Sequence, residues 1–111
     1  MVLAAMAVDV DWESLGLEEL PFGGNYRGVE GVARFFDAVA AQEEPLEFEV
    51  EEFVVNDTTV VALGHEEMRV HSTGRTYRSP WAQVWTLRAG KVTKFRAYMD
   101  TAAMRAAHEP Q

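Results

Sequence analysis

The apolar residues between positions 29 and 42 recur at the spacing of an amphipathic helix. Positions separated by three, four and seven residues fall on one side of a helix. The residues that share this side are Val29, Val32, Ala33, Phe36, Val39 and Ala40. Pro45 follows this segment, and proline does not continue a helix because it lacks the backbone N–H. The pattern therefore predicts one helix over 29–42 that ends before Pro45.

Four runs that resemble strands follow this helix. Apolar and polar positions alternate in them, as in strands with one covered face. The runs are LEFEVEEFVV (46–55), TVVALGHEEMRV (59–70), RTYRSPWAQVWTL (75–87) and KVTKFRAYM (91–99). The segments NDT, HSTG and RAG between them have the chemistry of turns. Asp100 then precedes the short helical pattern TAAMRAAH (101–108), and we expect it to cap that helix.

The first 28 residues have weaker patterns. VLAAMAV (2–8) favours about two turns of helix, a length that is marginal in water. Val10 to Glu13 could form a short strand, and the glycine-rich segment 15–28 is expected to be a loop. Helices followed by an antiparallel meander are typical of an α+β fold with a curved antiparallel sheet packed on helices. The absence of repeats or linkers predicts a single domain over residues 1–111.

The hairpin between the last two runs determines which side chains face inward. A three-residue loop, Arg88-Ala89-Gly90, needs the left-handed conformation only at glycine, so we expect Trp85 opposite Thr93 and Gln83 opposite Phe95. The inward face then holds Trp81, Gln83, Trp85, Thr93, Phe95, Ala97 and Met99. Arg96 and Asp100 point outward.

Extending this parity to the preceding run places Gly64 opposite Gln83 and Glu66 opposite Trp81. The inward residues of that run are Gly64, Glu66, Met68 and Val70, and its outward residues are His65, Glu67, Arg69 and His71. Glu66 is the only carboxylate that this register places inside the sheet. A slip of one residue would expose it instead.

Composition restricts the classes of partner. The net charge of −8 argues against binding to nucleic acid and to anionic membranes. The chain has no cysteine, so thiolate metal sites and cysteine nucleophiles are excluded. No metal or cofactor is predicted, because His65 and His71 lack a third ligand, and His108 is expected in a solvent-exposed tail. MVLAAMAV is too short for a signal peptide, so a cytoplasmic location is expected.

Five segments together resemble a known family. They are AVDVDW (7–12), YRGVEGVARFF (26–36), STGR (72–75), PWAQVW (80–85) and GKVTKFRAYMD (90–100). They are similar to the SnoaL-like, ketosteroid-isomerase-related proteins of the nuclear transport factor 2-like superfamily. The resemblance implies a cone-shaped α+β barrel, also called cystatin-like, in which a curved antiparallel sheet wraps around helices and a deep apolar pocket. It also implies that a first helix is missing here, which would expose an apolar groove and favour a homodimer or higher homo-oligomer.

The resemblance also assigns positions in the family's active sites. Ser14 matches the aspartate that is the general base of the isomerases, and Gln83 matches the carboxylic acid of their oxyanion hole. In the polyketide cyclases the Gln83 position is a histidine, and the catalytic aspartate matches Ala97. None of these acid–base groups is retained in this chain.

Two functions remain open. In the first, a hydrophobic carbonyl compound is the substrate of a cofactor-free isomerase or cyclase, with Glu66 as proton acceptor and Gln83 as oxyanion donor. The residues expected around that substrate are Trp12, Ser14, Phe36, Met68, Trp81, Trp85, Phe95, Ala97 and Met99. The aromatic and methionine residues among them could equally form an ordinary core. In the second, the chain is a non-catalytic ligand-binding or dimerisation module.

Overall fold

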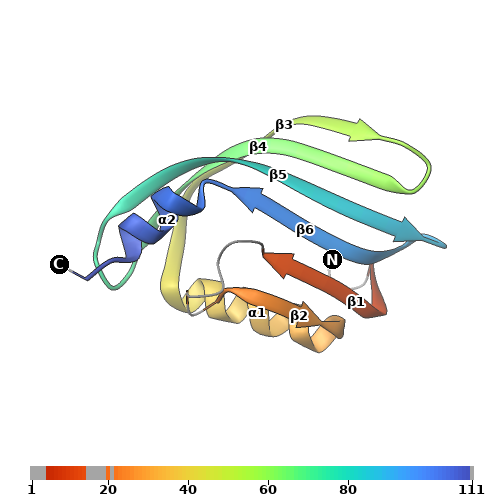
Figure 1. Ribbon diagram of the computed structural model, residues 1–111, viewed down its shortest axis with the longest axis horizontal. Helices are drawn as coiled ribbons and strands as arrows, with labels where there is room; N and C mark the ends of the chain where they lie inside the picture. The colour runs from red at the N-terminus through yellow and green to blue at the C-terminus, as the bar shows by residue number, and fades with distance from the viewer. Residues whose placement is uncertain (1–4, 15–19, 21, 111) are drawn as a thin grey trace.

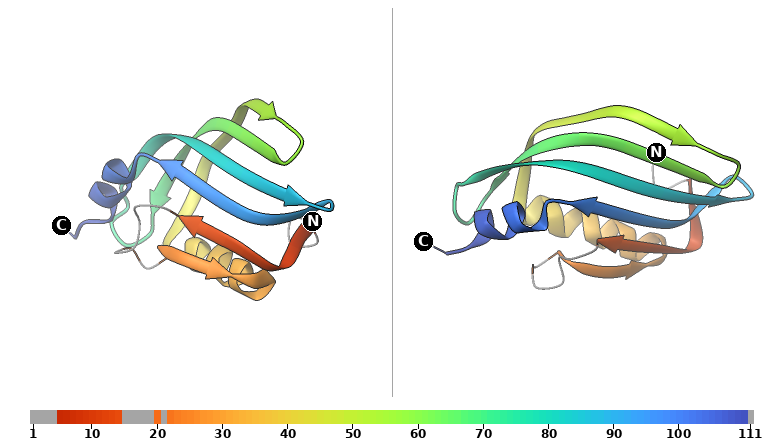
Figure 2. Two further views of the ribbon diagram at one scale, coloured as in Figure 1. Left: turned by 45° about the vertical axis from the view of Figure 1, so that its right-hand side comes forward. Right: turned by 45° about the horizontal axis from the view of Figure 1, so that its top comes forward.

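The computed structural model describes residues 5–14, 20 and 22–110. Its elements in chain order are β1 (Met6–Ser14), β2 (Gly24–Arg27), α1 (Gly28–Gln42), β3 (Glu43–Val55), β4 (Thr59–Val70), β5 (Thr76–Arg88), β6 (Lys91–Met99) and α2 (Thr101–His108) (Figure 1). The strands form one six-stranded sheet in the order β2-β1-β6-β5-β4-β3. This sheet is curved and open, with α1 packed on its β1–β2 end and α2 beside β5 (Figure 2). Among the described residues no helix is long and apolar enough to cross a membrane.

The α+β class is confirmed, and so are the predicted 29–42 helix, the four strands and the final helix. The Asp100 carboxylate caps α2 by accepting a hydrogen bond from the backbone N–H of Ala103 at 3.0 Å. The backbone N–H of Asp100 in turn donates to the buried Ser79 hydroxyl at 2.8 Å, which ties the start of α2 to β5.

The N-terminal predictions need two corrections. Residues 6–8, expected to be helical, belong to β1, because pairing with β6 outweighs the weak preference of so short a helix. Within the predicted loop, Gly24–Arg27 form β2, which pairs antiparallel with β1. The remainder of the predicted helix and of the predicted loop falls partly on 1–4, 15–19 and 21, outside the described residues.

The sheet is mixed, whereas the sequence pattern predicted an antiparallel one. β1 pairs with β6 in parallel, with Trp12 beside Phe95 and Ser14 beside Ala97. Alternation within a strand does not encode the direction of a neighbour that is distant in sequence, so this pairing could not be read from the pattern. The remaining neighbours in the sheet are antiparallel, as expected.

The β5–β6 hairpin has a different turn from the predicted one but the same inward face. Arg88 pairs with Lys91, so the turn is the two residues Ala89-Gly90, and Ala89 adopts φ 52°. A bulge near Thr86 then shifts the register once more, which places Trp85 opposite Phe95 and Gln83 opposite Ala97. The predicted pairing is therefore wrong by two residues. Because side chains alternate with a period of two, the predicted faces survive.

The β4–β5 pairing shows the same kind of shift. Gly64 lies opposite Trp81, Ala62 opposite Gln83 and Glu66 opposite Ser79. The loop spans four residues, 71–74, and is closed by a hydrogen bond from the Val70 N–H to the Arg75 carbonyl at 2.8 Å. The predicted inward face of β4 is retained, but Glu66 stands farther along the strand from Gln83 than the sequence suggested.

Trp81 leaves no room for a side chain at Gly64. A Cβ atom there would lie 2.0 Å from the Glu49 carbonyl oxygen and 2.5 Å from the Trp81 ring. Trp81 is buried and stacks on Phe48 with ring centroids 4.9 Å apart. The close approach of β3 and Trp81 to β4 therefore requires glycine at this position.

We expect Gly64→Ala to destabilise the fold by at least about 2 kcal/mol, because β3 or the Trp81 ring must move. Chemical denaturation measures the change. Gly31→Ala is the matched control, since a Cβ at this α1 position has its nearest neighbour at 3.5 Å and alanine favours helix. Equal stability of the Gly64→Ala variant and the wild type would contradict the packing described here.

Candidate functional site

The concave side of the sheet encloses a cavity of about 340 Å³ together with α1 and α2. Its walls are mainly apolar and come from seven elements and the segment before β2. The lining residues are Ser14, Phe22, Phe35, Phe36, Val39, Glu43, Pro45, Phe48, Glu66, Met68, Tyr77, Gln83, Phe95, Ala97, Met99 and Met104. Such a size and composition are common among small-molecule sites.

The site residues expected from the sequence divide into two groups. Those that line the cavity are Ser14, Phe36, Met68, Phe95, Ala97, Met99, Glu66 and Gln83. The three tryptophans are not among its lining residues. Trp12 stacks on Phe95 with ring centroids 3.8 Å apart, and Trp85 meets the same ring edge-on at 4.6 Å. Trp81 stacks on Phe48 with ring centroids 4.9 Å apart.

One end of the cavity contains hydrogen-bond donors. Ser14, Ala97 and Gln83 are neighbours across β1, β6 and β5, so they form one row on the concave face. The Gln83 Oε1 atom accepts a hydrogen bond from Trp85 Nε1 at 3.3 Å. This contact leaves the amide NH₂ of Gln83 to donate to a ligand.

The other end contains a buried network that sequence reasoning missed. The Glu43 side chain, at the junction of α1 and β3, is 2% exposed. Its Oε1 atom accepts a hydrogen bond from the Tyr77 hydroxyl at 2.7 Å, and its Oε2 atom lies 2.5 Å from His108 Nε2. The expectation that Glu66 is the only inward carboxylate is therefore wrong.

His108 corrects a second expectation, because its side chain is 8% exposed rather than free in solvent. α2 holds it there, since the Thr73 hydroxyl donates to the Ala107 carbonyl at 2.7 Å and the Arg75 side chain donates to the Ala106 carbonyl at 3.2 Å. The alternation of β5 could have identified Tyr77, which has the same parity as Gln83. The positions of Glu43 and His108 depend on helix ends that only the folded chain brings together.

Among the described residues that line the cavity, Glu66 is the one whose pKa is shifted into the physiological pH range. Burial, followed by the charge of Glu43, raises its pKa from 4.5 to about 7. No hydrogen bond or ion pair to the Glu66 carboxyl is formed by the residues that the structure describes. Burial also raises the pKa of Tyr77, with its hydrogen bond to Glu43 as the next cause, so this phenol stays neutral.

Glu66 and Gln83 lie too far apart to contact adjacent atoms of one ligand. Gln83 lies opposite Ala62, four residues before Glu66, which corresponds to about 13 Å along β4 at 3.3 Å per residue. The sequence-based register had placed them on neighbouring pairs. This correction assigns the two side chains to different ends of any ligand in the cavity.

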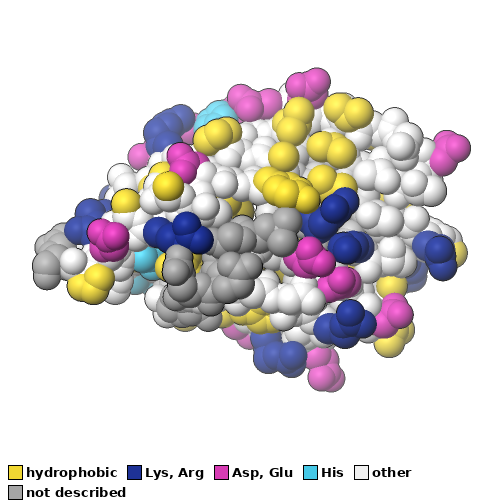
Figure 3. Space-filling model, in the orientation of Figure 1, with side chains coloured by type: hydrophobic (Ala, Val, Ile, Leu, Met, Phe, Trp, Pro, Cys, Tyr) yellow, Lys and Arg dark blue, Asp and Glu magenta, His cyan; other side chains and the backbone are white. Residues whose placement is uncertain are grey.

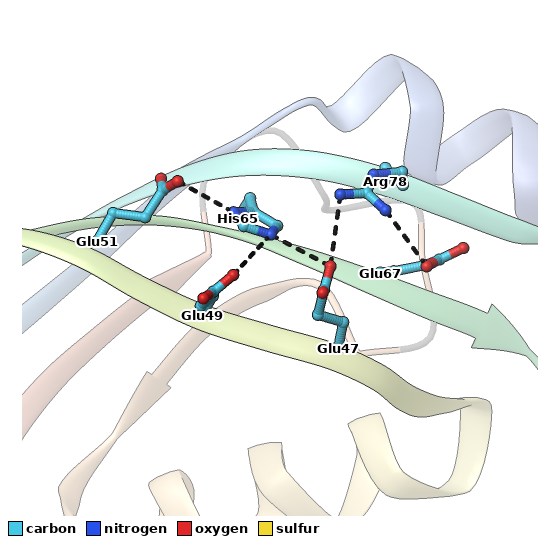
Figure 4. A network of polar contacts seen from close by, with 6 residues as sticks. All are labelled: Glu47, Glu49, Glu51, His65, Glu67 and Arg78. Carbon is cyan, nitrogen blue, oxygen red and sulfur yellow. Dashed lines mark hydrogen bonds and ion pairs between the residues drawn. The ribbon is translucent and has the colours of Figure 1, made fainter.

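The convex face has its own polar cluster, which lies on the opposite side of the sheet from the cavity (Figure 4). His65 Nε2 lies 3.2 Å from Glu47 and 3.3 Å from Glu49, and His65 Nδ1 lies 3.3 Å from Glu51. Arg78 joins Glu47 to Glu67. One ligand atom each from Glu47, Glu49 and His65 fit within 4.8 Å, so these residues could hold a cation. They supply partners for His65 that the sequence pattern did not reveal.

Comparisons with known proteins agree on the fold. The family model of the SnoaL-like domain matches residues 1–95. An NTF2-like protein from Burkholderia xenovorans is 34% identical with a TM-score of 0.88, and the match covers 96% of this chain and 80% of that one. An NTF2-like protein of unknown function from Burkholderia pseudomallei is 28% identical with a TM-score of 0.89, over 98% and 83% of the two chains.

A third similar structure is that of TerC co-crystallised with polyporic acid. It is 27% identical to this chain with a TM-score of 0.83, and the match covers 95% of this chain and 81% of TerC. None of the curated proteins compared with this chain matches it.

The raised pKa of Glu66 predicts a pH-dependent stability difference between the wild type and Glu66→Gln. The folded state binds this proton more tightly than the unfolded state, so the free energy of unfolding falls as the pH rises from about 4.5 to about 7. Glutamine does not titrate. We expect the stability of the variant relative to wild type to increase by about 3 kcal/mol between pH 4 and pH 8.

Urea denaturation of both proteins across this range checks the prediction. Glu67→Gln, at the neighbouring outward position of β4, is the control and should show a much smaller change. A parallel pH dependence of wild type and Glu66→Gln would mean that Glu66 titrates as an ordinary carboxylate.

Proposed function

This chain belongs to the SnoaL-like domain family, and we propose that its cavity binds a hydrophobic small molecule with a carbonyl group and transfers a proton on it without a cofactor. The reaction would be of the isomerase or cyclase type. The observation that carries the proposal is Glu66, a carboxyl group with a pKa of about 7 in a cavity with mainly apolar walls.

The acidity of Glu66 suits reversible proton transfer near neutral pH. A general base is most effective when its pKa lies near the working pH, because it then both accepts and returns a proton readily. A carboxylate with a pKa of about 7 is a stronger base than an ordinary glutamate and accepts a proton from the carbon next to a carbonyl more readily. Glu66 has no competing donor among the described residues, so its carboxyl can approach a ligand directly.

Gln83 takes a different role in this proposal from the one inferred from the sequence. Because it lies about 13 Å along the sheet from Glu66, it orients the ligand rather than stabilising charge beside the atom that loses the proton. Its amide NH₂ and the Ser14 hydroxyl are suited to bind an oxygen atom of the ligand. The co-crystal of TerC with polyporic acid supports small-molecule binding by this fold.

A second candidate function is a non-catalytic ligand-binding or dimerisation module. The observation that favours it is the row Ser14, Ala97 and Gln83. These three residues stand where the resemblance places the family's acid–base groups, and none of them can serve as a general base of suitable pKa. Turnover or its absence with a bound ketone separates the two candidates.

We also propose that the protein forms a homodimer through the β3 apolar surface, which we define as Phe48, Val50, Phe53 and Val55. These side chains are between 44% and 65% exposed. Val50, Phe53 and Val55 pair with β4 residues that face the concave side of the sheet, so they lie on that side themselves. Figure 3 shows hydrophobic side chains gathered over the β3–β4 part of the molecule. A contiguous apolar surface at a sheet edge favours association with a second copy.

Flat hydrophobic ketones should bind saturably and quench tryptophan fluorescence. The reason is that Phe95 and Phe48 line the cavity, and the tryptophans contact these two rings: Trp12 and Trp85 contact Phe95, and Trp81 contacts Phe48.

NMR in D₂O would then measure exchange at the carbon next to the carbonyl. We expect Glu66→Gln to slow exchange by about a hundredfold or more with little change in affinity, and Glu67→Gln to match wild type. Equal exchange in Glu66→Gln removes Glu66 from the mechanism, and binding without exchange in any variant supports the non-catalytic module.

Light scattering at micromolar concentration should report a dimer for the wild type. We expect Phe53→Glu to give a monomer, because a charge on the β3 apolar surface would be desolvated on association. Val54→Glu is the matched control, since Val54 is 54% exposed on the opposite face of the same strand. A monodisperse wild-type monomer would refute the dimer.

A further inference from the structure

The end of the cavity lined by Glu43, Glu66 and Tyr77, called the acidic end below, offers more hydrogen-bond acceptors than donors. The Tyr77 hydroxyl proton is already donated to Glu43, so the Tyr77 oxygen offers only lone pairs to a ligand. The Glu43 carboxylate is an acceptor at both oxygens and retains lone pairs beside Tyr77 and His108. Glu66, when ionised, is an acceptor as well. When Glu66 is ionised, a ligand group at this end must therefore supply hydrogen-bond donors.

The charges at this end are unbalanced in the same direction. Glu43 and Glu66 both line the cavity, and the repulsion from Glu43 is one cause of the weak acidity of Glu66. The described lining residues include no lysine or arginine. His108 contacts Glu43 from the side of α2, and among the described residues it is the one basic side chain in contact with either carboxyl group. A positively charged ligand group would relieve this repulsion.

The walls at this end suit a cation with an apolar body. Phe22, Phe48 and Tyr77 are lining residues, and Phe22 packs against His108 with ring centroids 5.7 Å apart. The face of an aromatic ring attracts an ammonium group within about 6 Å. Carboxylates backed by aromatic rings in a partly closed cavity therefore favour a protonated amine over a neutral group of the same size.

The Gln83 end has the opposite character. The carbonyl oxygen of the Gln83 side chain is occupied by Trp85, whereas its NH₂ group can donate. Ser14 adds a hydroxyl on the same row. The two ends of the cavity thus differ in kind: donors stand at the Gln83 end, and acceptors stand about 13 Å along β4 at the Glu66 end.

From this arrangement we propose that the ligand is bipolar, with a protonated amine at the Glu43–Glu66–Tyr77 end, a carbonyl oxygen at the Ser14–Gln83 end and an apolar body between them. This inference rests on the proposed binding of a carbonyl compound, since it names the class of molecule that the same cavity takes. It favours the non-catalytic candidate, because Glu66 would pair with the ammonium group about 13 Å from the carbonyl and could not remove a proton next to that carbonyl. Anionic groups are rejected at the acidic end by the two carboxylates.

Isothermal titration calorimetry with four matched compounds tests the inference. Each is a biphenyl with an acetyl group at one para position and, at the other, an aminomethyl, a hydroxymethyl, an ethyl or a carboxylate group. We expect the aminomethyl compound to bind about tenfold or more tightly than the ethyl compound, and the carboxylate to bind weakest. Glu66→Gln should remove most of this preference, and Glu67→Gln should retain it.

Proton release gives a second readout that a purely structural role of Glu66 would not produce. At pH 7 about half of the Glu66 side chains carry a proton, and a bound ammonium group should expel it. Titrations in two buffers of different ionisation enthalpy should therefore show release of up to about half a proton per aminomethyl compound. The release should vanish in Glu66→Gln and be absent with the ethyl compound.

The outcomes separate this inference from the proposed function. Binding of the ethyl compound with equal affinity for the aminomethyl compound keeps the proposed function and overturns the inference. Equal affinity for the hydroxymethyl and aminomethyl compounds shows that a neutral donor suffices and overturns the assignment of a cation. If no compound binds, the cavity is not a site for such molecules and both proposals fall.

Discussion

The cavity depends on one geometric constraint, the two-residue period with which side chains alternate along β4, β5 and β6. This period places Glu66, Met68, Tyr77, Gln83, Phe95, Ala97 and Met99 on the concave face together. The tight Ala89-Gly90 turn and the bulge near Thr86 each move the strands by one residue, and together they restore the alternation. Without the bulge, one of the two strands would present its opposite face to the cavity. The packing of Trp81 over Gly64 holds β3 and β4 on this framework.

The second physical theme is the cost of placing carboxylates in an apolar cavity. A buried charge is tolerated when it is paired and hydrogen-bonded. Glu43 meets this condition through Tyr77 and His108, which come from β5 and the end of α2. Glu66 has no such partner among the described residues, and burial next to Glu43 raises its pKa instead. The two carboxyl groups of one cavity thus stand in contrasting environments, which is the condition under which acid and base roles separate.

These polar groups do not occupy the positions that the family resemblance assigns to catalysis. That row consists here of Ser14, Ala97 and Gln83, of which only Ser14 and Gln83 can form side-chain hydrogen bonds and none is a base of suitable pKa. The titratable groups stand instead along the part of the sheet covered by α2. The same scaffold can thus keep its cavity while its titratable groups stand at other positions along the strands, because fold and site are set by different residues. The open apolar edge at β3 is a separate feature of the scaffold and bears on assembly rather than on chemistry.

The sequence by itself determined the α+β class, the two helices, the four strands of the meander and the side of the sheet that the assigned residues of β4, β5 and β6 face. It did so because helix and strand periods are local and survive errors of register by two. Tertiary structure decided the parallel pairing of β1 with β6, the separation of Glu66 from Gln83, and the burial of His108 against Glu43. Each of these depends on segments far apart in the chain, and no local pattern records how such segments align. The tryptophans that the sequence placed around a ligand show the same limit. Alternation assigns a side chain to a face of the sheet, but it does not tell whether another ring lies between that side chain and the cavity.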